Sequence, residues 1–212
     1  MKKKNKAIYL LFLMPFVYFA TACFVVWLVK TSGIYPSGSD TMYHVYRGDY
    51  VYNAIKSGNW YPLYDPAWYN GVEILRYWSP FPAYVMAFCQ YLAGGSQFGA
   101  YLFYIGGVCF LGACVWPFIG RGFNRPYLGA FIGLLWFFMP NNLCAIFIEG
   151  NLARSLSMIF LPVFIYSVYK YLYNHKLRYI PLMVFTFLLM ELCHLGYAGM
   201  VAIACLLYTS DA

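Results

Sequence analysis

The sequence has few charged side chains. Only 10% of its 212 residues are Asp, Glu, Lys or Arg, whereas 63% are hydrophobic. A soluble domain carries roughly 25% charged residues, so too little polar surface remains here to cover a water-soluble particle. The apolar residues occur in runs of about 20, the length that crosses the roughly 30 Å hydrocarbon core of a bilayer. The scarcity of charge therefore predicts an all-α, multi-pass membrane protein with the lipid bilayer as its partner.

Motifs for a structural metal, a disulfide framework or nucleic-acid binding are also missing. None of the seven cysteines is part of a CxxC pair, and nearly all lie inside apolar runs, where cysteine acts as a small packing residue. Basic residues outnumber acidic residues by 14 to 7, but they are scattered between the apolar runs. A nucleic-acid-binding protein would gather them on one polar face, so we expect no nucleic-acid partner.

A transmembrane helical bundle of about five spans is predicted. The first apolar run continues too far to be a cleaved signal peptide. Residues 81–92 are apolar but too few to span, and they are bounded by Pro80 and Gly94. A segment of that length is more often interfacial or re-entrant, so we expect it to lie on the membrane surface. The five expected spans are Ala7–Val29, Phe98–Ile119, Tyr127–Ile148, Leu152–Tyr173 and Tyr179 to the end.

The distribution of basic residues predicts the orientation, because loops rich in Lys and Arg stay in the cytoplasm. If the N-terminus is cytoplasmic and residues 81–92 do not span, nine of the fourteen basic residues lie on the cytoplasmic side. The large first loop, residues 31–96, is then helical and extracytoplasmic. The nine residues are Lys2, Lys3, Lys4, Lys6, Arg121, Arg125, Lys170, Lys176 and Arg178.

The first loop holds the strongest chemical signal. Residues 41–56 can form a helix, on which Asp40, His44 and Arg47 follow one another at i, i+4 and i+7 along one face. A carboxylate with a histidine one turn away suits a general base or a pair of ligands for a divalent metal. The alternative is structural: Asp40 favours the positive end of the helix dipole and His44 is a solvated neighbour.

The first loop is also rich in aromatic residues, with thirteen between Tyr43 and Tyr84, including Trp60 and Trp68. Aromatic rings at a membrane boundary usually anchor in the headgroup region. They also present flat apolar faces on which sugar rings bind. Both roles remain open for Trp60 and Trp68.

Two further groups of polar residues lie at or near the expected outer face. Glu149, Asn151 and Arg154 join two spans, and they suit either a polar or phosphorylated ligand or a simple turn with an ion pair. Glu191 and His194 lie at i and i+3 within the last apolar run. Ionisable groups inside a span are functional candidates by default, although a buried pair that only holds helices together is the alternative.

Several short motifs resemble a known family. The resemblance is to bacterial membrane proteins described as 6-pyruvoyl-tetrahydropterin synthase-related, which in turn are similar to C-type (GT-C) polytopic membrane glycosyltransferases. It extends over most of residues 1–204, and no pterin chemistry is expected from it. The motifs are Gly38-Ser39-Asp40-Thr41 with His44, Gly58-Asn59-Trp60-Tyr61-Pro62, Trp68-Tyr69-Asn70-Gly71, Tyr77-Trp78-Ser79-Pro80-Phe81-Pro82, Glu149-Gly150-Asn151-Leu152 and His194.

The resemblance implies a glycosyltransferase that takes a sugar from a polyprenyl-phosphate donor at the outer face of the cell membrane. Asp40 would be the base or a metal ligand, Glu149 a second catalytic carboxylate and Arg154 a contact to the donor phosphate. Residues 81–92 would be the juxtamembrane helix of the first loop. Thr41 stands where the family often has a second acidic residue, which leaves open whether a metal is used.

Two other functions are compatible with the sequence. One is a non-catalytic membrane component of envelope-polysaccharide assembly, and the other is a transporter that uses Glu191 and His194. Residues 205–212 resemble the translation of a sequencing-library adapter, so we assign residues 1–204 to the N-terminal part of a GT-C-like domain and give Asp211 no functional role.

Overall fold

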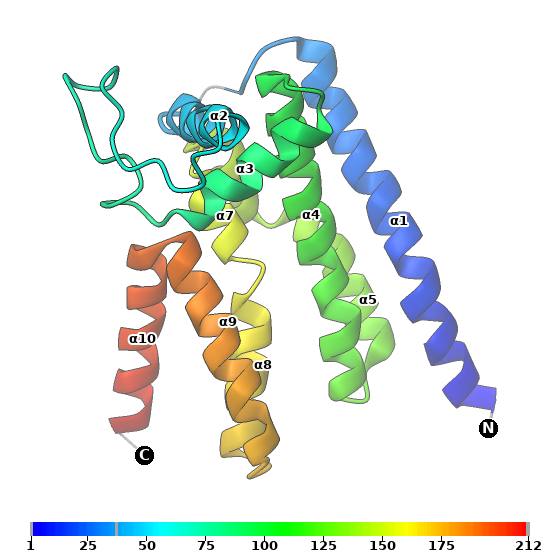
Figure 1. Cartoon of the computed structure of the whole chain (residues 1–212). Helices are drawn as coiled ribbons and strands as arrows, with labels where there is room; N and C mark the ends of the chain where they lie inside the picture. The colour runs from blue at the N-terminus through cyan, green and yellow to red at the C-terminus, as the bar shows by residue number, and fades with distance from the viewer. Residues whose placement is uncertain (1, 37, 211–212) are drawn as a thin grey trace.

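The chain folds into a helical bundle with two helices laid across one end. The computed structural model describes residues 2–36 and 38–210, so Asp211 lies outside it. Helices α1, α4, α5, α8, α9 and α10 run along the bundle, and α2 and α3 cross its end (Figure 1). The described residues form no β-strand, only an isolated bridge between Asp65 and Val72. The all-α prediction is confirmed.

The helices have the following bounds: α1 Lys2–Ser32, α2 Thr41–Lys56, α3 Phe81–Leu92, α4 Gln97–Gly122, α5 Pro126–Leu135, η1 Trp136–Phe138, α6 Pro140–Leu143, η2 Cys144–Ile148, α7 Leu152–Ser157, α8 Leu161–Leu172, η3 Leu177–Tyr179, α9 Ile180–Cys193 and α10 Leu195–Ser210.

Four helical stretches of the described chain are long and apolar enough to cross a membrane. They coincide with the first four predicted spans, although two of them are interrupted: a 3-10 turn and a π turn follow α5, and a bend separates α7 from α8. Large apolar side chains such as Phe12, Phe16 and Phe131 are exposed on the bundle, as expected where lipid replaces water as the solvent. The four stretches are Phe12–Ser32, Gln97–Gly122, Pro126–Ile148 and Leu152–Leu172.

The fifth predicted span differs from the expected continuous helix. The backbone is extended at His194, with φ −155° and ψ 95°, and this residue ends α9. Helix α10 then turns back beside α9 (Figure 1). The His194 side chain caps the new helix, because its Nδ1 accepts a hydrogen bond from the backbone N–H of Tyr197 at 3.0 Å. Residues 180–210 therefore form a helical hairpin.

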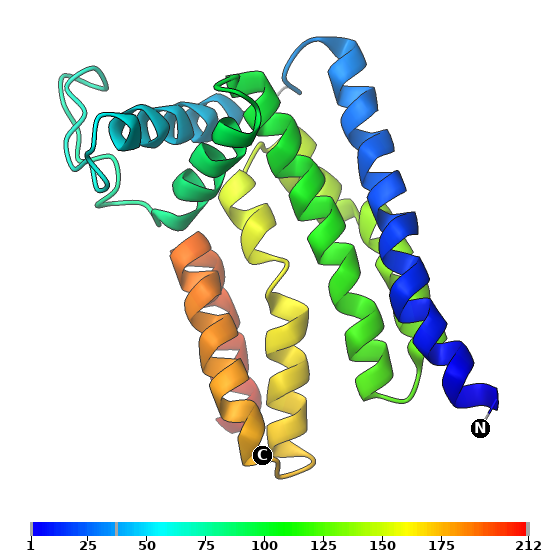
Figure 2. The same ribbon diagram turned by 45° about the vertical axis from the view of Figure 1, so that its right-hand side comes forward.

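The two ends of the bundle differ in charge. We call the end crossed by α2 and α3 the loop end, and the opposite end, where both chain termini lie, the terminal end (Figure 2). The α4–α5 and α8–α9 turns lie at the terminal end (Figures 1 and 2), and they carry Arg121, Arg125, Lys170, Lys176 and Arg178. The predicted placement of residues 81–92 across an end of the bundle, rather than through it, agrees with the position of α3.

Close contact between α4 and α5 depends on small residues. A Cβ atom on Gly129 would lie 2.4 Å from the Trp116 carbonyl oxygen, and one on Gly133 would lie 2.8 Å from the Ala113 carbonyl oxygen. The GxxxG spacing of these glycines lets the two backbones approach within van der Waals contact. This packing brings the helix of the third span against the second.

We expect the two ends of the bundle to be accessible from opposite sides of the membrane. A cysteine replacing Asn59, in the exposed loop after α2, should react with a membrane-impermeant maleimide in intact cells. A cysteine replacing Asn124, in the α4–α5 turn, should react only after permeabilisation, because we expect the basic turns to be cytoplasmic by the positive-inside rule. The unsubstituted chain measures the background from its own cysteines. Equal labelling of both positions in intact cells would contradict the orientation.

Candidate functional site

A cavity of about 820 Å³ lies at the loop end, where the first loop meets α7 and the α9–α10 turn. It collects residues that are far apart in the sequence and that come from three parts of the fold. Its polar lining residues are Ser39, Asp40, His44, Arg47, Glu73, Ser79, Asn151 and His194, and its aromatic lining residues are Tyr43, Trp68, Tyr69, Tyr77 and Trp78.

One face of α2 forms a wall of this cavity. Asp40 precedes the helix, and Tyr43, His44 and Arg47 follow at the helical spacing that the sequence predicted. Asp40 stands at the N-cap position, but its side chain makes no capping hydrogen bond. Within the described chain its carboxylate also has no ion-pair partner. Asp40 therefore stands at the positive end of the α2 dipole, as the structural alternative requires, but no hydrogen bond or ion pair among the described residues occupies its carboxylate.

The other carboxylates of the first loop have structural partners. Asp49 accepts a hydrogen bond from Gln90 Nε2 at 2.7 Å, which ties α2 to α3. Asp65 accepts from the Tyr46 hydroxyl and from the backbone N–H of Ala67. Glu73 pairs with Arg76 at 2.6 Å on the surface. Asp40 is thus distinguished from its neighbours by the absence of such a partner among the described residues.

Two glycines bring the motifs around Asp40 and Glu149 together. A Cβ atom on Gly38 would lie 2.7 Å from the Gly150 backbone, and Gly150 itself has a φ of +69°, which favours glycine. The approach lets the Asp40 backbone N–H donate to the Glu149 carbonyl oxygen at 3.1 Å, and the Ser39 hydroxyl donates to the same oxygen. Segments 110 residues apart are joined in this way.

The Glu149 side chain has partners within its own turn. Its carboxylate pairs with Arg154 at 2.8 Å, and Arg154 also donates to Asn141 Oδ1 at 3.3 Å. Neither Glu149 nor Arg154 lines the cavity. Of the two interpretations of this turn, the geometry matches the ion pair. The assignment of Glu149 as a catalytic residue and of Arg154 as a phosphate contact remains a prediction.

Asn151 and His194 meet at the cavity wall. Asn151 Nδ2 lies 3.4 Å from His194 Nε2, and Asn151 Oδ1 caps α7 by accepting from the Arg154 backbone N–H. Ser79 from the first loop donates to the Glu191 carbonyl oxygen at 2.9 Å and accepts from the Leu195 N–H at 3.3 Å. The Glu191 side chain is exposed, and no ion pair joins it to His194 within the described chain.

His44 is buried among positive groups. Burial is the main reason that its pKa falls from 6.5 to about 3, and the charges of Arg47 and His194 lower it further. The imidazole is therefore neutral at physiological pH. A neutral imidazole can donate or accept a hydrogen bond without repelling a cationic or anionic ligand strongly.

The aromatic residues divide into two groups. Trp68 lines the cavity and packs against Tyr43 and Tyr46, with ring centroids 5.3 and 4.5 Å apart. Trp60 is 71% exposed and lies outside the cavity, with its carbonyl oxygen bound by the Tyr84 hydroxyl. Trp78 also lines the cavity; it is part of the Tyr77–Pro82 motif, but the sequence predicted no role in ligand binding for it.

The residues present do not form a metal site by themselves. Asp40 and His44 are the two candidate ligands, and no group of three His, Cys, Asp or Glu side chains in the described ranges is placed to hold a metal ion.

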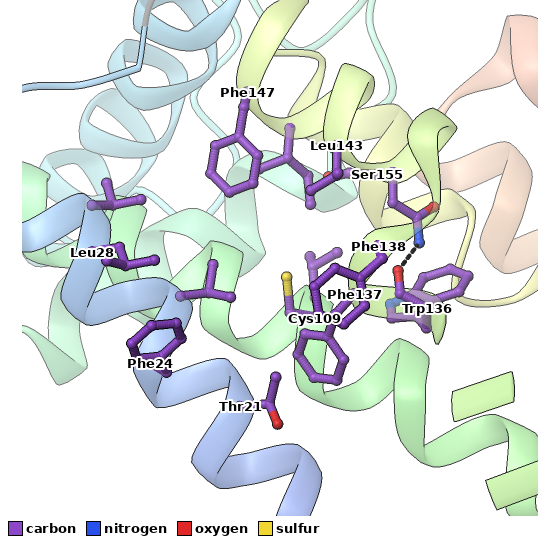
Figure 3. Close-up of a pocket in the computed structure, with 15 residues that line it drawn as sticks. Thr21, Phe24, Leu28, Cys109, Trp136, Phe137, Phe138, Leu143, Phe147 and Ser155 are labelled. Atoms are coloured by element: carbon purple, nitrogen blue, oxygen red, sulfur yellow. Dashed lines mark hydrogen bonds between the residues drawn. The ribbon is translucent and has the colours of Figure 1, made fainter. Parts of the chain in front are cut away.

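A second cavity, of about 360 Å³, lies between α1, α4 and the interrupted helix that follows α5. Figure 3 shows Phe24 and Leu28 of α1 on one side of it and Phe137 and Phe147 on the other. The polar lining residues are few: Thr21, Asn142 and Ser155. Helix α7 separates the two cavities, because Asn151 and Ala153 line the first and Ser155 lines the second.

The fold and these cavities define a polytopic helical membrane protein with a polar site at one end of its bundle. A family model for the 6-pyruvoyl-tetrahydropterin synthase related domain, described as a membrane protein, matches residues 75–209. The chain therefore belongs to this family of membrane proteins. Comparison with curated proteins and with solved structures gave no match.

The depressed pKa of His44 predicts a pH-dependent stability. Between pH 6.5 and about 3 the unfolded chain binds a proton at this position and the folded chain does not, so stability falls as the pH falls. At pH 5 the loss attributable to His44 is about 2 kcal/mol. We expect thermal unfolding in detergent to show a smaller decrease in stability from pH 7.5 to pH 5 for His44→Gln than for the unsubstituted chain.

The exposed His175 provides the control. His175→Asn should retain the full pH dependence, because this side chain lies at the terminal end and Asn tolerates its positive φ of 48°. An unchanged pH dependence in His44→Gln would show that His44 is not held neutral in the folded chain.

Proposed function

We propose that this protein is a membrane glycosyltransferase of the GT-C type. It would transfer a sugar from a polyprenyl-phosphate donor to an acceptor hydroxyl at the outer face of the cell membrane. One observation carries the proposal: the carboxylate of Asp40, which has no partner among the described residues, lies in an aromatic-lined cavity at the loop end. The excess of basic residues at the opposite end supports an extracytoplasmic position for this cavity.

Asp40 would act as the general base. Its carboxylate takes the proton of the acceptor hydroxyl as the acceptor oxygen attacks the anomeric carbon of the sugar. The bond from that carbon to the phosphate oxygen breaks, and the polyprenyl phosphate leaves with the bonding electrons. The attack and departure take place on opposite sides of the carbon, so the anomeric configuration is inverted.

The other lining residues suit sugar binding. Tyr43, Trp68 and Trp78 lie close together, with Tyr43 centroids 5.3 Å from Trp68 and 5.9 Å from Trp78. Such rings offer flat apolar faces to a pyranose. His44, which is neutral, and Asn151 provide hydrogen-bonding groups for hydroxyls. The Glu149–Arg154 ion pair would position Asn151 through the short turn that they share, and Arg154 is the predicted contact to the donor phosphate.

The second cavity suits the hydrocarbon chain of the donor. It lies among helices that are long enough to span the membrane, and it is lined almost entirely by apolar side chains. Since residues of α7 line both cavities, one amphiphilic molecule would place its hydrocarbon chain in the second, apolar cavity and its headgroup in the first, polar one.

Two alternatives make different predictions. A non-catalytic component of polysaccharide assembly would tolerate loss of the Asp40 carboxylate. A transporter is favoured by one observation, the helix interruption at His194, because transporters bind their substrates at discontinuous helices. It would require a continuous path through the bundle, and the carboxylate of Glu191 would be essential for transport.

Loss of the Asp40 carboxylate should abolish transfer. In the full-length protein, Asp40→Asn removes the base while keeping the side-chain shape, so we expect sugar transfer to fall by a factor of about 10² to 10⁴. Transfer is measured with a radiolabelled polyprenyl-phosphate sugar in membranes. Asp49→Asn is the matched control: it removes a charge from the same helix, and its amide oxygen can still accept from Gln90. Unchanged transfer by Asp40→Asn would exclude the proposed role.

Filling the second cavity should weaken binding of long-chain donors. Val25 lines the cavity, so Val25→Phe should raise the KM for a full-length polyprenyl donor several-fold. The KM for a donor shortened to ten carbons should change little, since its chain occupies less of the cavity. Cys23→Phe is the control, because Cys23 is exposed on another face of α1. An equal change for both donor lengths would argue against a chain in this cavity.

A further inference from the structure

Arg47 differs from Arg76 of the first loop and Arg154 of α7, because each of those two arginines pairs with a glutamate. Its side chain is only 1% exposed, yet it forms no ion pair within the described chain. Its Nη2 donates to the carbonyl oxygens of Trp78 and Ser79, both at 3.3 Å, while its buried Nε has no hydrogen-bond partner. Removing an isolated charge from water at such a position is unfavourable unless an anion compensates it.

The surroundings of Arg47 do not supply that anion. The guanidinium faces the Tyr43 ring, with its carbon 5.4 Å from the centroid. The carboxylates that line the same cavity are Asp40, two helical turns away on α2, and Glu73, which is paired with Arg76. Arg154, by contrast, is neutralised by Glu149 at 2.8 Å. The uncompensated positive charge of the cavity therefore belongs to Arg47.

We propose that Arg47 forms a subsite for a compact oxyanion, a phosphoryl or carboxylate group of the ligand that enters this cavity. A guanidinium offers parallel N–H donors that match two oxygens of either group. His44 can add a hydrogen bond without adding a charge. The inference concerns the cavity of the proposed glycosyltransferase but does not depend on sugar transfer, because binding is measured without turnover.

Two pairs of probes distinguish the sources of the oxyanion. The first pair is citronellyl phosphate and citronellol, which differ only in the phosphoryl group. The second is octyl glucuronide and octyl glucoside, which differ in the sugar carboxylate. Each probe is titrated into the full-length protein in detergent, and the thermal unfolding midpoint is followed. Binding to the folded chain raises the midpoint with increasing concentration.

We expect one charged probe to stabilise the unsubstituted protein more than its neutral counterpart. Arg47→Gln should weaken binding of that charged probe about tenfold or more, and it should leave binding of the neutral probe unchanged. Lys56→Gln is the matched control, since it removes an exposed positive charge from the same helix outside the cavity. A preference for the phosphate probe identifies a lipid phosphate headgroup, and a preference for the glucuronide identifies an acidic sugar.

Two results would overturn the subsite. One is equal stabilisation by charged and neutral members of both pairs. The other is an unchanged preference of Arg47→Gln for the charged probe over the neutral one. Arg47 would then have only a structural role, the hydrogen bonds from α2 to the Trp78 and Ser79 carbonyl oxygens. If Arg47→Gln does not fold, Arg47→Lys is tested instead, because lysine keeps the positive charge but lacks the paired N–H donors of a guanidinium. Weaker binding of the charged probe by Arg47→Lys would support the subsite, and unchanged binding would refute it.

Discussion

The structure depends on satisfying backbone groups where helices are interrupted within the bundle. Helix α9 has 14 residues and so extends about 21 Å, less than the roughly 30 Å of hydrocarbon, and its end at His194 would otherwise leave unpaired N–H and C=O groups in an apolar medium. Ser79 from the first loop bonds both sides of this interruption, and His194 caps the helix that follows. The hydrogen bonds of Ser79 therefore hold the first loop against the interrupted helix. The polar cavity lies where the first loop meets the α9–α10 turn.

The same arrangement sets the electrostatics of the cavity. Its walls are mostly aromatic and apolar, so charges inside it interact more strongly than they would in water. Burial keeps His44 neutral, and Arg47 is a buried cation with no ion-pair partner among the described residues. Asp40, at the edge of the cavity, is only partly buried and keeps access to an entering ligand. A carboxylate and a cation at different places in one cavity suit the proposed ligand, which has both a reacting hydroxyl and an anionic group.

Much of this arrangement could be predicted from the sequence because it depends on periodicity and composition. The spacing of Asp40, His44 and Arg47 correctly predicted one face of α2, and the short apolar run between Pro80 and Gly94 coincides with a separate 12-residue helix that lies across the end of the bundle (Figure 1). The turn at His194 was missed, because Cys193 to Leu195 contain neither proline nor glycine and the interruption is stabilised by Ser79, more than 110 residues earlier. The Glu149–Arg154 ion pair was one of the two roles predicted for its turn, but which residues of that turn line the cavity depends on tertiary contacts.

The contrast between Arg47 and Arg154 shows why position in the sequence alone does not identify a binding residue. Arg154 lies in a polar motif and is the more obvious candidate, yet Glu149 sits five residues before it and the turn brings the two within 2.8 Å. Arg47 lies in a helix that also contains Asp49, but Asp49 is two residues away and so points to another side, where Gln90 binds it. The helical geometry that separates Arg47 from the nearest acidic residue is what leaves its charge available to a ligand.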